Sequence, residues 1–355
     1  MPRSPLLEKL NPAEAQLIDH NGWEVPSSFN SAEAEYWALK KGAGLMDLSH
    51  RTRILVLGKD APRFLHGMVT NDVKGLTPGQ GNHAFLLNVQ GHILADLRIF
   101  RLEPEVFLLD SEPQSSQIIT DTLDRHIIAD VVELEDKRGE LACIALDGPR
   151  ARETLGQAGL KLPAMTLLEY FYSEELAARI ARVSLSGRDG VWIMATPDRA
   201  AELWRKILDA SSNTGVRPVG FEALEICRIE AGIPRYGIDI TEKNLPQETG
   251  QMDAISFTKG CYIGQEVVER IRSRGHVNRK LMRLVFDGKE TVPSDIPVFS
   301  EGQDVGTMCS SAYSFGLGKS IGLGYLRKEA AVAGSRVMAG HLPAVIAELP
   351  LFDPS

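Results

Sequence analysis

The chain has 355 residues, enough for two or three domains, and its 43% hydrophobic and 24% charged residues are typical of a soluble globular protein. A formal net charge of −8 argues against a general attraction to nucleic acid or to an anionic membrane. The N-terminus has no apolar run of signal-peptide length, its early acids argue against an organelle transit peptide, and no apolar stretch approaches membrane-spanning length. We therefore expect a cytoplasmic, monomeric protein with no membrane association.

The first half of the chain alternates helix and strand patterns. After an irregular arm with one short helix around residues 13–19, a capping pattern at Asn30 or Ser31 opens a helix that stops at Gly42 or Gly44. Strands at 83–89 and 93–101 are joined by a tight turn at Gln90-Gly91. The other elements expected here are a strand at 53–57, a helix through 64–68, a strand at 106–110, a helix at 113–126 and a strand at 129–134.

The order of elements then repeats. A strand at 141–146 runs into a helix that starts at Pro149-Arg150, strands at 180–186 and 191–195 flank a glycine turn, and Thr196-Pro197 opens an amphipathic helix. Each half thus has the order strand, helix, strand, strand, helix. This order predicts two tandem split β-α-β, ferredoxin-like modules in an α+β fold.

The last part of the chain has a different pattern. A helix from about 220 to 231 precedes an irregular stretch at 233–253, and from residue 279 short apolar runs separated by glycine and proline have all-β spacing. We expect a two-module region at 1–278, followed by a C-terminal β-barrel domain at 279–355.

The stretch that most strongly indicates a reactive site is Lys-Gly-Cys-Tyr-Ile-Gly-Gln-Glu, at residues 259–266. The apolar positions after Gly264 suit a helix face, and a helix that begins here would place its free N–H groups and positive dipole end beside Cys261. With Lys259 nearby, that placement favours the thiolate over the thiol. The alternative is a glycine turn with a buried cysteine that packs as a small apolar group.

The other cysteines give weaker signals. No two of the four have short C-x-x-C spacing, which argues against a zinc or iron–sulfur site held by this chain alone. Cys143 and Cys227 lie in apolar sequence typical of a core, and the role of Cys309 is undecided.

Two further segments carry candidate groups. Asp96 lies on a strand just after a hairpin turn, where its carboxylate could hydrogen-bond a ligand or accept a proton, or could be a solvated strand end. A basic run at 270–283 could meet an anion or be a solvated face. This run lacks interleaved aromatic side chains, which argues against stacking on single-stranded nucleic acid.

Several of these segments resemble known proteins. Lys259–Glu266 resembles the signature of the YgfZ family of folate-binding proteins, which are related to the glycine cleavage T-protein, an aminomethyltransferase. Five other segments of the chain resemble T-protein segments: Gly22-Trp23-x-Val25-Pro26, Asp47-Leu48-Ser49-His50, Thr70-Asn71-Asp72, Arg228-x-Glu230-x-Gly232 and Tyr236-Gly237-x-Asp239. The resemblance implies tetrahydrofolate, or a derivative, in a central cavity that the two modules surround and whose wall includes His50.

The resemblance also implies roles for individual residues. Asp96 would meet the one-carbon-bearing nitrogens of the folate, and Glu230 would accept hydrogen bonds from the pterin. Tyr236 and Arg272 complete the folate-binding candidates, Cys261 and Asp96 are the catalytic candidates, and the signature residues are Lys259, Gly260, Cys261, Tyr262, Gly264, Gln265 and Glu266.

Two positions depart from the T-protein pattern. Ala95 stands where T-proteins have the first of two adjacent acids, so the catalytic acid pair is incomplete. Arg188 stands where they have a glutamate that helps to bind the pterin, which reverses a charge.

Three functions follow as hypotheses. The first is a YgfZ-type tetrahydrofolate-binding protein that supports assembly or repair of iron–sulfur enzymes through Cys261, with those enzymes or assembly proteins as partners. The second is an aminomethyltransferase that moves a one-carbon unit from an aminomethyl-lipoyl carrier to tetrahydrofolate. The third is an RNA-modification accessory protein that acts through the basic run at 270–283. The signature favours the first, and whether the chain catalyses a reaction stays open.

Overall fold

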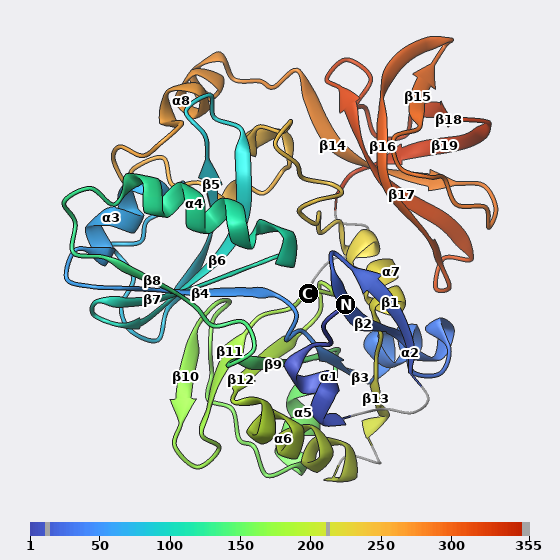
Figure 1. Cartoon of the computed structure of the whole chain (residues 1–355). Coiled ribbons are helices and arrows are strands. Elements are labelled where there is room, and N and C mark those ends of the chain that lie inside the picture. The colour runs from blue at the N-terminus through green and yellow to red at the C-terminus, as the bar shows by residue number, and fades with distance from the viewer. Residues whose placement is uncertain (11–14, 211–213, 350–355) are drawn as a thin grey trace. The chain divides into compact units, whose positions relative to one another are not determined.

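The computed structural model describes residues 1–10, 15–210 and 214–349, and the chain forms two compact units (Figure 1). Unit 1 consists of residues 1–65, 73–83 and 97–224, and unit 2 consists of residues 66–72, 84–96 and 225–355. The expected domain boundary at 278/279 stays a prediction.

The first part of the chain forms most of the elements expected of it. α2 (Ala32–Lys41) begins where the Ser31 hydroxyl accepts the Ala34 N–H and ends at Gly42, as the capping pattern predicts. The remaining elements are α1 (Pro5–Leu10), β1 (Gln16–His20), β2 (Trp23–Ser28), β3 (Ala43–Asp47), β4 (Thr52–Leu57), α3 (Ala61–Met68), β5 (Gly81–Leu87), β6 (Ile93–Glu103), β7 (Val106–Ser111), a 3-10 turn (Pro113–Ser115), α4 (Ser116–His126) and β8 (Glu133–Asp136).

The sequence predicted none of α1, β2 and β3, and two further elements differ from its prediction. The helix expected around 13–19 is wrong from residue 16 on, because 16–20 pair with β2 as a hairpin; residues 13 and 14 lie outside the described part of the chain. The strand expected at 129–134 begins at Glu133 instead, because the Asp60 carboxylate accepts the Val131 N–H at 2.8 Å and holds that segment as a loop.

The expected repeat is present as strand order in two sheets. β4, β5, β6, β7 and β8 form one sheet in the order β5-β6-β7-β4-β8. The second sheet has the order β10-β11-β12-β9-β3-β13, which is the same arrangement with β3 inserted. Its other elements are β9 (Ala142–Asp147), α5 (Ala151–Gln157), β10 (Tyr170–Ser173), β11 (Ala178–Arg182), β12 (Gly190–Ala195), α6 (Pro197–Ala210) and β13 (Val216–Pro218).

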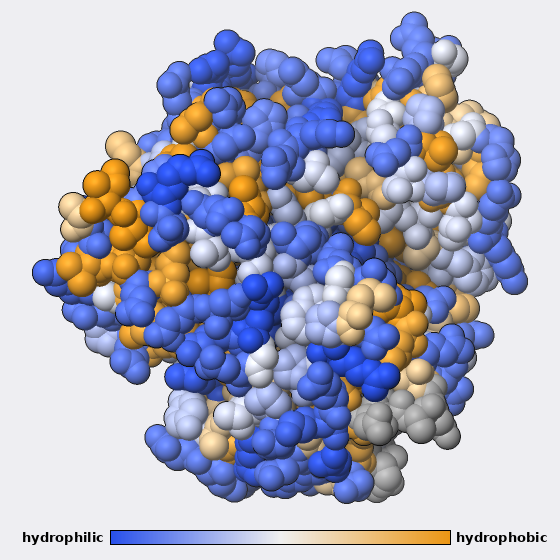
Figure 2. Space-filling model, viewed as in Figure 1, coloured by the Kyte–Doolittle hydropathy of each residue, from blue (hydrophilic) through white to orange (hydrophobic). Residues whose placement is uncertain are grey.

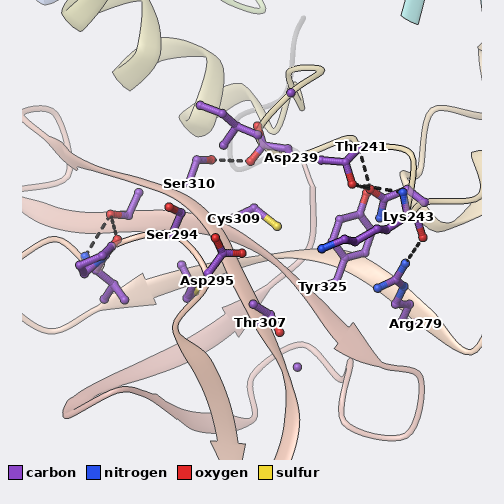
Figure 3. A pocket seen from close by; sticks show the side chains of 18 of the residues that line it. Asp239, Thr241, Lys243, Arg279, Ser294, Asp295, Thr307, Cys309, Ser310 and Tyr325 are labelled. Atoms are coloured by element: carbon purple, nitrogen blue, oxygen red, sulfur yellow. Dashed lines mark hydrogen bonds between the residues drawn. The ribbon is translucent and has the colours of Figure 1, made fainter. Parts of the chain in front are cut away.

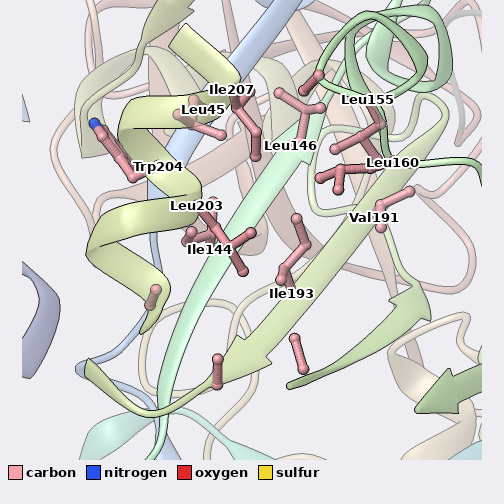
Figure 4. Close-up of a cluster of buried hydrophobic side chains, with 14 of the residues drawn as sticks. Leu45, Ile144, Leu146, Leu155, Leu160, Val191, Ile193, Leu203, Trp204 and Ile207 are labelled. Carbon is pink, nitrogen blue, oxygen red and sulfur yellow. The ribbon is translucent and has the colours of Figure 1, made fainter. Parts of the chain in front are cut away.

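The apolar core of unit 1 lies between the second sheet and helices α5 and α6 (Figure 4). The face of α6 that carries Leu203, Trp204 and Ile207 packs on Ile144 and Ile193 of the central strands. These strands are buried on every residue, so their sequences are continuous apolar runs rather than alternating ones.

Unit 2 contains the signature segment and the barrel. α7 (Phe221–Ala231) leads into an irregular stretch with two 3-10 turns, Pro246–Glu248 and Met252–Ala254, and then into α8 (Gln265–Arg274). The closed barrel has the order β14-β17-β16-β15-β18-β19 and closes through pairing of β19 with β14. Its strands are β14 (Arg279–Phe286), β15 (Pro297–Ser300), β16 (Gln303–Ser314), β17 (Lys319–Arg327), β18 (Arg336–Ala339) and β19 (Leu342–Ala347). The expected C-terminal β-barrel is therefore confirmed.

Unit 1 also exposes apolar side chains. Figure 2 shows such side chains over the connection between α4 and β8, where Ile128 and Val131 are exposed. Single exposed apolar side chains are common on protein surfaces.

The packing of the core of unit 1 predicts how much the truncation of one of its side chains lowers the free energy of unfolding. We expect Ile193→Ala, in the centre of β12, to lower the free energy of unfolding by about 3 kcal/mol, because it removes buried methyl groups and leaves a cavity. The measurement is chemical denaturation of the full chain. The matched control is Leu167→Ala, at an exposed position, for which we expect a change within about 0.5 kcal/mol. Equal losses would contradict the assignment of this core.

Candidate functional site

The signature segment begins α8 through a glycine. Gly264 is the N-cap of α8 at φ 82°, and Gly260 has φ 96°, both in the region that favours glycine. The Gln265 N–H donates to the Tyr262 carbonyl at 3.2 Å, and Glu266 pairs with Arg270 one turn on. The expected helix start is confirmed: the N-cap lies three residues after Cys261, and α8 begins at the next residue.

A tight backbone contact, here called the glycine contact, joins this segment to the hairpin at 88–92. A Cβ atom on Gly264 would lie 2.6 Å from the Asn88 carbonyl oxygen, and one on Gly91 would lie 2.8 Å from the Val267 Cβ. Neither position has room for a side chain without movement of backbone or a β-branched neighbour. Glycine at both positions therefore allows the hairpin and the start of α8 to pack directly.

Lys259 binds carbonyl groups rather than the cysteine. Its ammonium donates to the carbonyl of His66 and, at 2.7 Å, to that of Val69, at the end of α3. The same nitrogen lies 4.6 Å from the centroid of the buried Tyr262 ring. Cys261 itself is exposed, so the alternative of a buried cysteine does not hold for this residue.

Asp96 lies near Tyr236. Burial raises the pKa of the Tyr236 phenol, and the charges of Glu242 and Asp96 raise it further. The Tyr236 ring belongs to one apolar cluster with Ile93 of the hairpin strand and Tyr262 of the signature. The structure thus brings together three of the segments that the sequence marks as candidates.

Glu230 and Arg228 lie in a buried polar network. Glu230 is fully buried and accepts a hydrogen bond from the Ser314 hydroxyl, while its backbone carbonyl accepts one from Arg283 at 2.8 Å. Arg228 pairs with Glu225 at 2.7 Å and Asp239 at 2.6 Å.

Arg272 lies on α8, and the basic run continues from the end of this helix into β14. The Arg272 guanidinium stands 4.6 Å from the Phe257 ring centroid and 3.5 Å from the Glu269 carboxylate, with its side chain half-exposed. Because Arg270 pairs with Glu266 at 2.8 Å, acids of the same helix partly offset the positive charge of this run.

A cavity of about 1160 Å³ lies in unit 2, between the segment 236–244 and the barrel. Its lining includes Tyr236 but not Asp96, Glu230, Cys261 or Arg272. It also includes Cys309, Tyr325 and Arg279, which the sequence analysis did not single out as a group. Their grouping follows from strand register in the barrel, which no short-range sequence signal predicts.

With this geometry described, comparison with known proteins becomes informative. The family model described as the GCVT N-terminal domain matches residues 6–259, and the glycine cleavage T-protein C-terminal barrel domain matches residues 279–353. The chain belongs to the glycine cleavage T-protein family.

Similar proteins match over nearly their whole length. The chain is 31% identical to an aminomethyltransferase of Desulfitobacterium hafniense (strain DSM 10664 / DCB-2), over 94% of this chain and 92% of that protein. It is 29% identical to the aminomethyltransferase of Bacillus subtilis (strain 168), over 94% and 93%. The crystal structure of glycine cleavage system aminomethyltransferase T from Bartonella henselae is similar with a TM-score of 0.90 and 25% identity, covering 99% of this chain and 98% of that one.

The two departures from the T-protein pattern have different structural settings. Ala95 is fully buried on β6 whereas Asp96 is only partly buried, as expected for neighbours whose side chains point to opposite faces of a strand. The Ala95 substitution therefore leaves the face that carries Asp96 unchanged. Arg188 lies in a turn in which its N–H donates to the Ser184 hydroxyl at 3.1 Å.

The T-protein-like segment at 47–50 lies in the interior of unit 1. His50 is buried with its ring centroid 5.4 Å from that of His20. Burial, followed by the charge of His20, lowers the pKa of His50 well below its ordinary value, so the ring is neutral at pH 7.

Neither a membrane span nor a metal cluster is found in the described residues. Within 1–10, 15–210 and 214–349, no helix is long and apolar enough to cross a membrane. In the same ranges, no three His, Cys, Asp or Glu side chains are grouped to hold a metal ion.

The glycine contact predicts different costs for two otherwise similar substitutions. Gly264→Ala and Gly275→Ala both place a side chain at positive φ, which costs about 1 kcal/mol, but only Gly264 has backbone within 4 Å of the new Cβ. We expect Gly264→Ala to lower the free energy of unfolding more than Gly275→Ala. Urea denaturation measures both, and equal losses would mean that the hairpin does not constrain the signature segment.

Proposed function

We propose that this chain is an aminomethyltransferase that transfers a one-carbon unit from an aminomethyl group on a lipoyl carrier protein to tetrahydrofolate. The observation that carries the proposal is the match to T-proteins through both of their domains, in a chain that retains the carboxylate Asp96 and places its charge where it acts on Tyr236. The full-length similarity to proteins named aminomethyltransferase supports the same reaction.

The proposed reaction balances without an oxidant or a metal. Two nitrogens of tetrahydrofolate each form a bond to the methylene carbon of the protonated aminomethyl group, and the carbon–sulfur and carbon–nitrogen bonds break. The two folate N–H protons pass to the departing sulfur and to the departing amine. The products are methylene-tetrahydrofolate, a free thiol on the carrier and an ammonium ion.

Asp96 is the proposed group for orientation and charge stabilisation. A carboxylate near the one-carbon-bearing nitrogens accepts hydrogen bonds from them and stabilises positive charge as the carbon is transferred. Tyr236 remains a neutral phenol at pH 7, because burial and nearby acids raise its pKa, so it can donate a hydrogen bond.

The remaining candidates fit tetrahydrofolate to different degrees. Arg272 is half-exposed and could pair with the carboxylate tail of a folate. Glu230 accepts the Ser314 hydroxyl on one carboxylate oxygen and is fully buried, so a pterin would reach it only if the surrounding side chains moved. We therefore assign the main folate-binding role to Asp96 and Tyr236.

Asp96→Asn tests the proposed transfer. With aminomethyl-loaded carrier protein and tetrahydrofolate, we expect the wild-type chain to release ammonium and form methylene-tetrahydrofolate. The variant should lose roughly 100-fold or more in kcat, because the amide cannot accept a proton or carry the negative charge. Asp209→Asn, at an exposed position on α6, is the matched control and should keep wild-type activity.

The assay also distinguishes transfer from folate binding alone. Calorimetry with tetrahydrofolate should show binding by the wild-type chain. A chain that binds tetrahydrofolate but releases no ammonium from the loaded carrier would contradict the transferase proposal and leave a folate-binding role.

A second candidate function rests on the exposure of Cys261. In this proposal, a YgfZ-type protein supports the assembly or repair of iron–sulfur enzymes, with the accessible thiol acting between two glycines of positive φ. The transferase has broader support, because the similar proteins are aminomethyltransferases over nearly their whole length.

Cys261→Ser separates the two candidates. The transferase proposal expects the variant to transfer the one-carbon unit at the wild-type rate, since the balanced reaction uses no protein thiol. The second candidate expects a loss of iron–sulfur enzyme activity in cells that carry the variant, while glycine cleavage continues. Wild-type behaviour in both assays would exclude the role for Cys261.

A further inference from the structure

The cavity of unit 2 is lined by several polar side chains that the proposed transfer reaction does not use. It lies between the segment 236–244 and the bulged strand β16, and Figure 3 labels Cys309, Tyr325, Lys243 and Arg279 among the side chains that line it. Its volume, about 1160 Å³, is enough for a small metabolite.

Tyr325 is a buried donor without an acceptor. Its side chain is 6% exposed, it lines the cavity, and its hydroxyl has no hydrogen-bond partner among the residues that the structure describes. Burial raises the pKa of this phenol well above its ordinary value, so the group stays protonated and can donate. Buried polar groups normally find partners, and an acceptor from a ligand would supply this one.

Cationic side chains line the same cavity as this hydroxyl. Arg279 stands 5.2 Å from the Tyr325 ring centroid, and its guanidinium is fixed by Glu248 at 2.9 Å and by the Lys243 carbonyl. Lys243 and Arg327 line the same cavity, and neither has a side-chain ion pair among the described residues. A preorganised guanidinium, a lysine and a phenol hydroxyl together suit an oxyanion.

Most of the acidic side chains that line the cavity already bind other groups of the protein. Asp239 binds Arg228 and Ser310, each at 2.6 Å, and Glu225 binds Arg228 at 2.7 Å. Asp304 accepts the Gly306 N–H at 3.1 Å. Asp304 and the two others, Glu242 and Asp295, are exposed, so water and salt screen their repulsion of an anion.

Cys309 shapes the cavity wall and does not supply a nucleophile. In the pairing of β16 with β17, Met308 opposes Gly324 and Ser310 opposes Leu323, so Cys309 is the extra residue of a bulge. Burial raises the pKa of its thiol to about 12, which keeps it neutral at pH 7. Binding here is therefore non-covalent.

We propose that this cavity binds a small ligand through an oxyanion, a carboxylate or a phosphate, held by the Tyr325 hydroxyl, Arg279 and Lys243. Asp96 does not line the cavity, whereas Tyr236, the other residue proposed to bind folate, does, so the two sites share one wall.

Calorimetry of the full chain with inorganic phosphate, and separately with acetate, tests this site at low ionic strength. We expect saturable binding of at least one anion, weakened about tenfold or more by Tyr325→Phe, because the anion loses a hydrogen-bond donor. The same variant should keep or raise the melting temperature, since the lost hydroxyl has no partner in the described protein. Lys243→Gln should also weaken binding, whereas Lys319→Gln, which removes a barrel ion pair with Asp287, should not.

Each result of this binding experiment either supports the proposed anion site or overturns it. Saturation by phosphate alone, by acetate alone or by both supports the site and indicates the source of the oxyanion. Absence of saturation by either anion, or wild-type affinity in both Tyr325→Phe and Lys243→Gln, overturns it. Because Asp96→Asn should bind the anion as the wild type does, failure of this proposal is distinguishable from failure of the proposed transfer.

Discussion

The close packing of two glycines is the constraint on which the candidate site depends. Gly91 ends a tight turn and Gly264 caps α8, and a Cβ on Gly264 would stand 3.1 Å from the Gly91 Cα. Only residues without side chains let the hairpin and the signature segment approach so closely. At the start of β6, just after this turn, the Ile93 N–H donates to the Asn244 carbonyl at 3.1 Å.

Asp96, the catalytic candidate, is positioned by the strand that follows the glycine contact. Asp96 lies three residues beyond Ile93 on the same strand, and the segment that contains Asn244 also carries Tyr236. The apolar cluster of Ile93, Tyr236 and Tyr262 holds these segments together by burial rather than by ion pairs. The signature segment thus packs in the same cluster as the strand that carries Asp96, and Lys259 joins it to two carbonyl groups at the end of α3.

The sequence predicted elements well where local signals decide them. The caps of α2, the apolar face of α6 and the start of α8 at Gly264 all form as expected, because capping groups, periodicity and glycine conformations act within a few residues. The helix expected around 13–19 failed at β1, since pairing with β2 is a tertiary contact that overrides local preference. The sequence also could not predict which distant residues lie together. Tyr325, Cys309 and Arg279 line one cavity because of how the barrel strands pair. Asp96 and Tyr236 could be singled out because they resemble family segments, but their proximity required the structure.

A double-mutant cycle on Gly91→Ala and Gly264→Ala tests the central claim most directly. Either substitution should separate the hairpin from the start of α8, so the second should then cost much less than it does alone. The account predicts that the double variant loses clearly less free energy of unfolding than the sum of the two single losses. In the control cycle, Gly275→Ala replaces Gly264→Ala, and the losses should then be additive. Additive losses in the Gly91–Gly264 cycle would contradict the account, because the two glycines would then not meet in one contact.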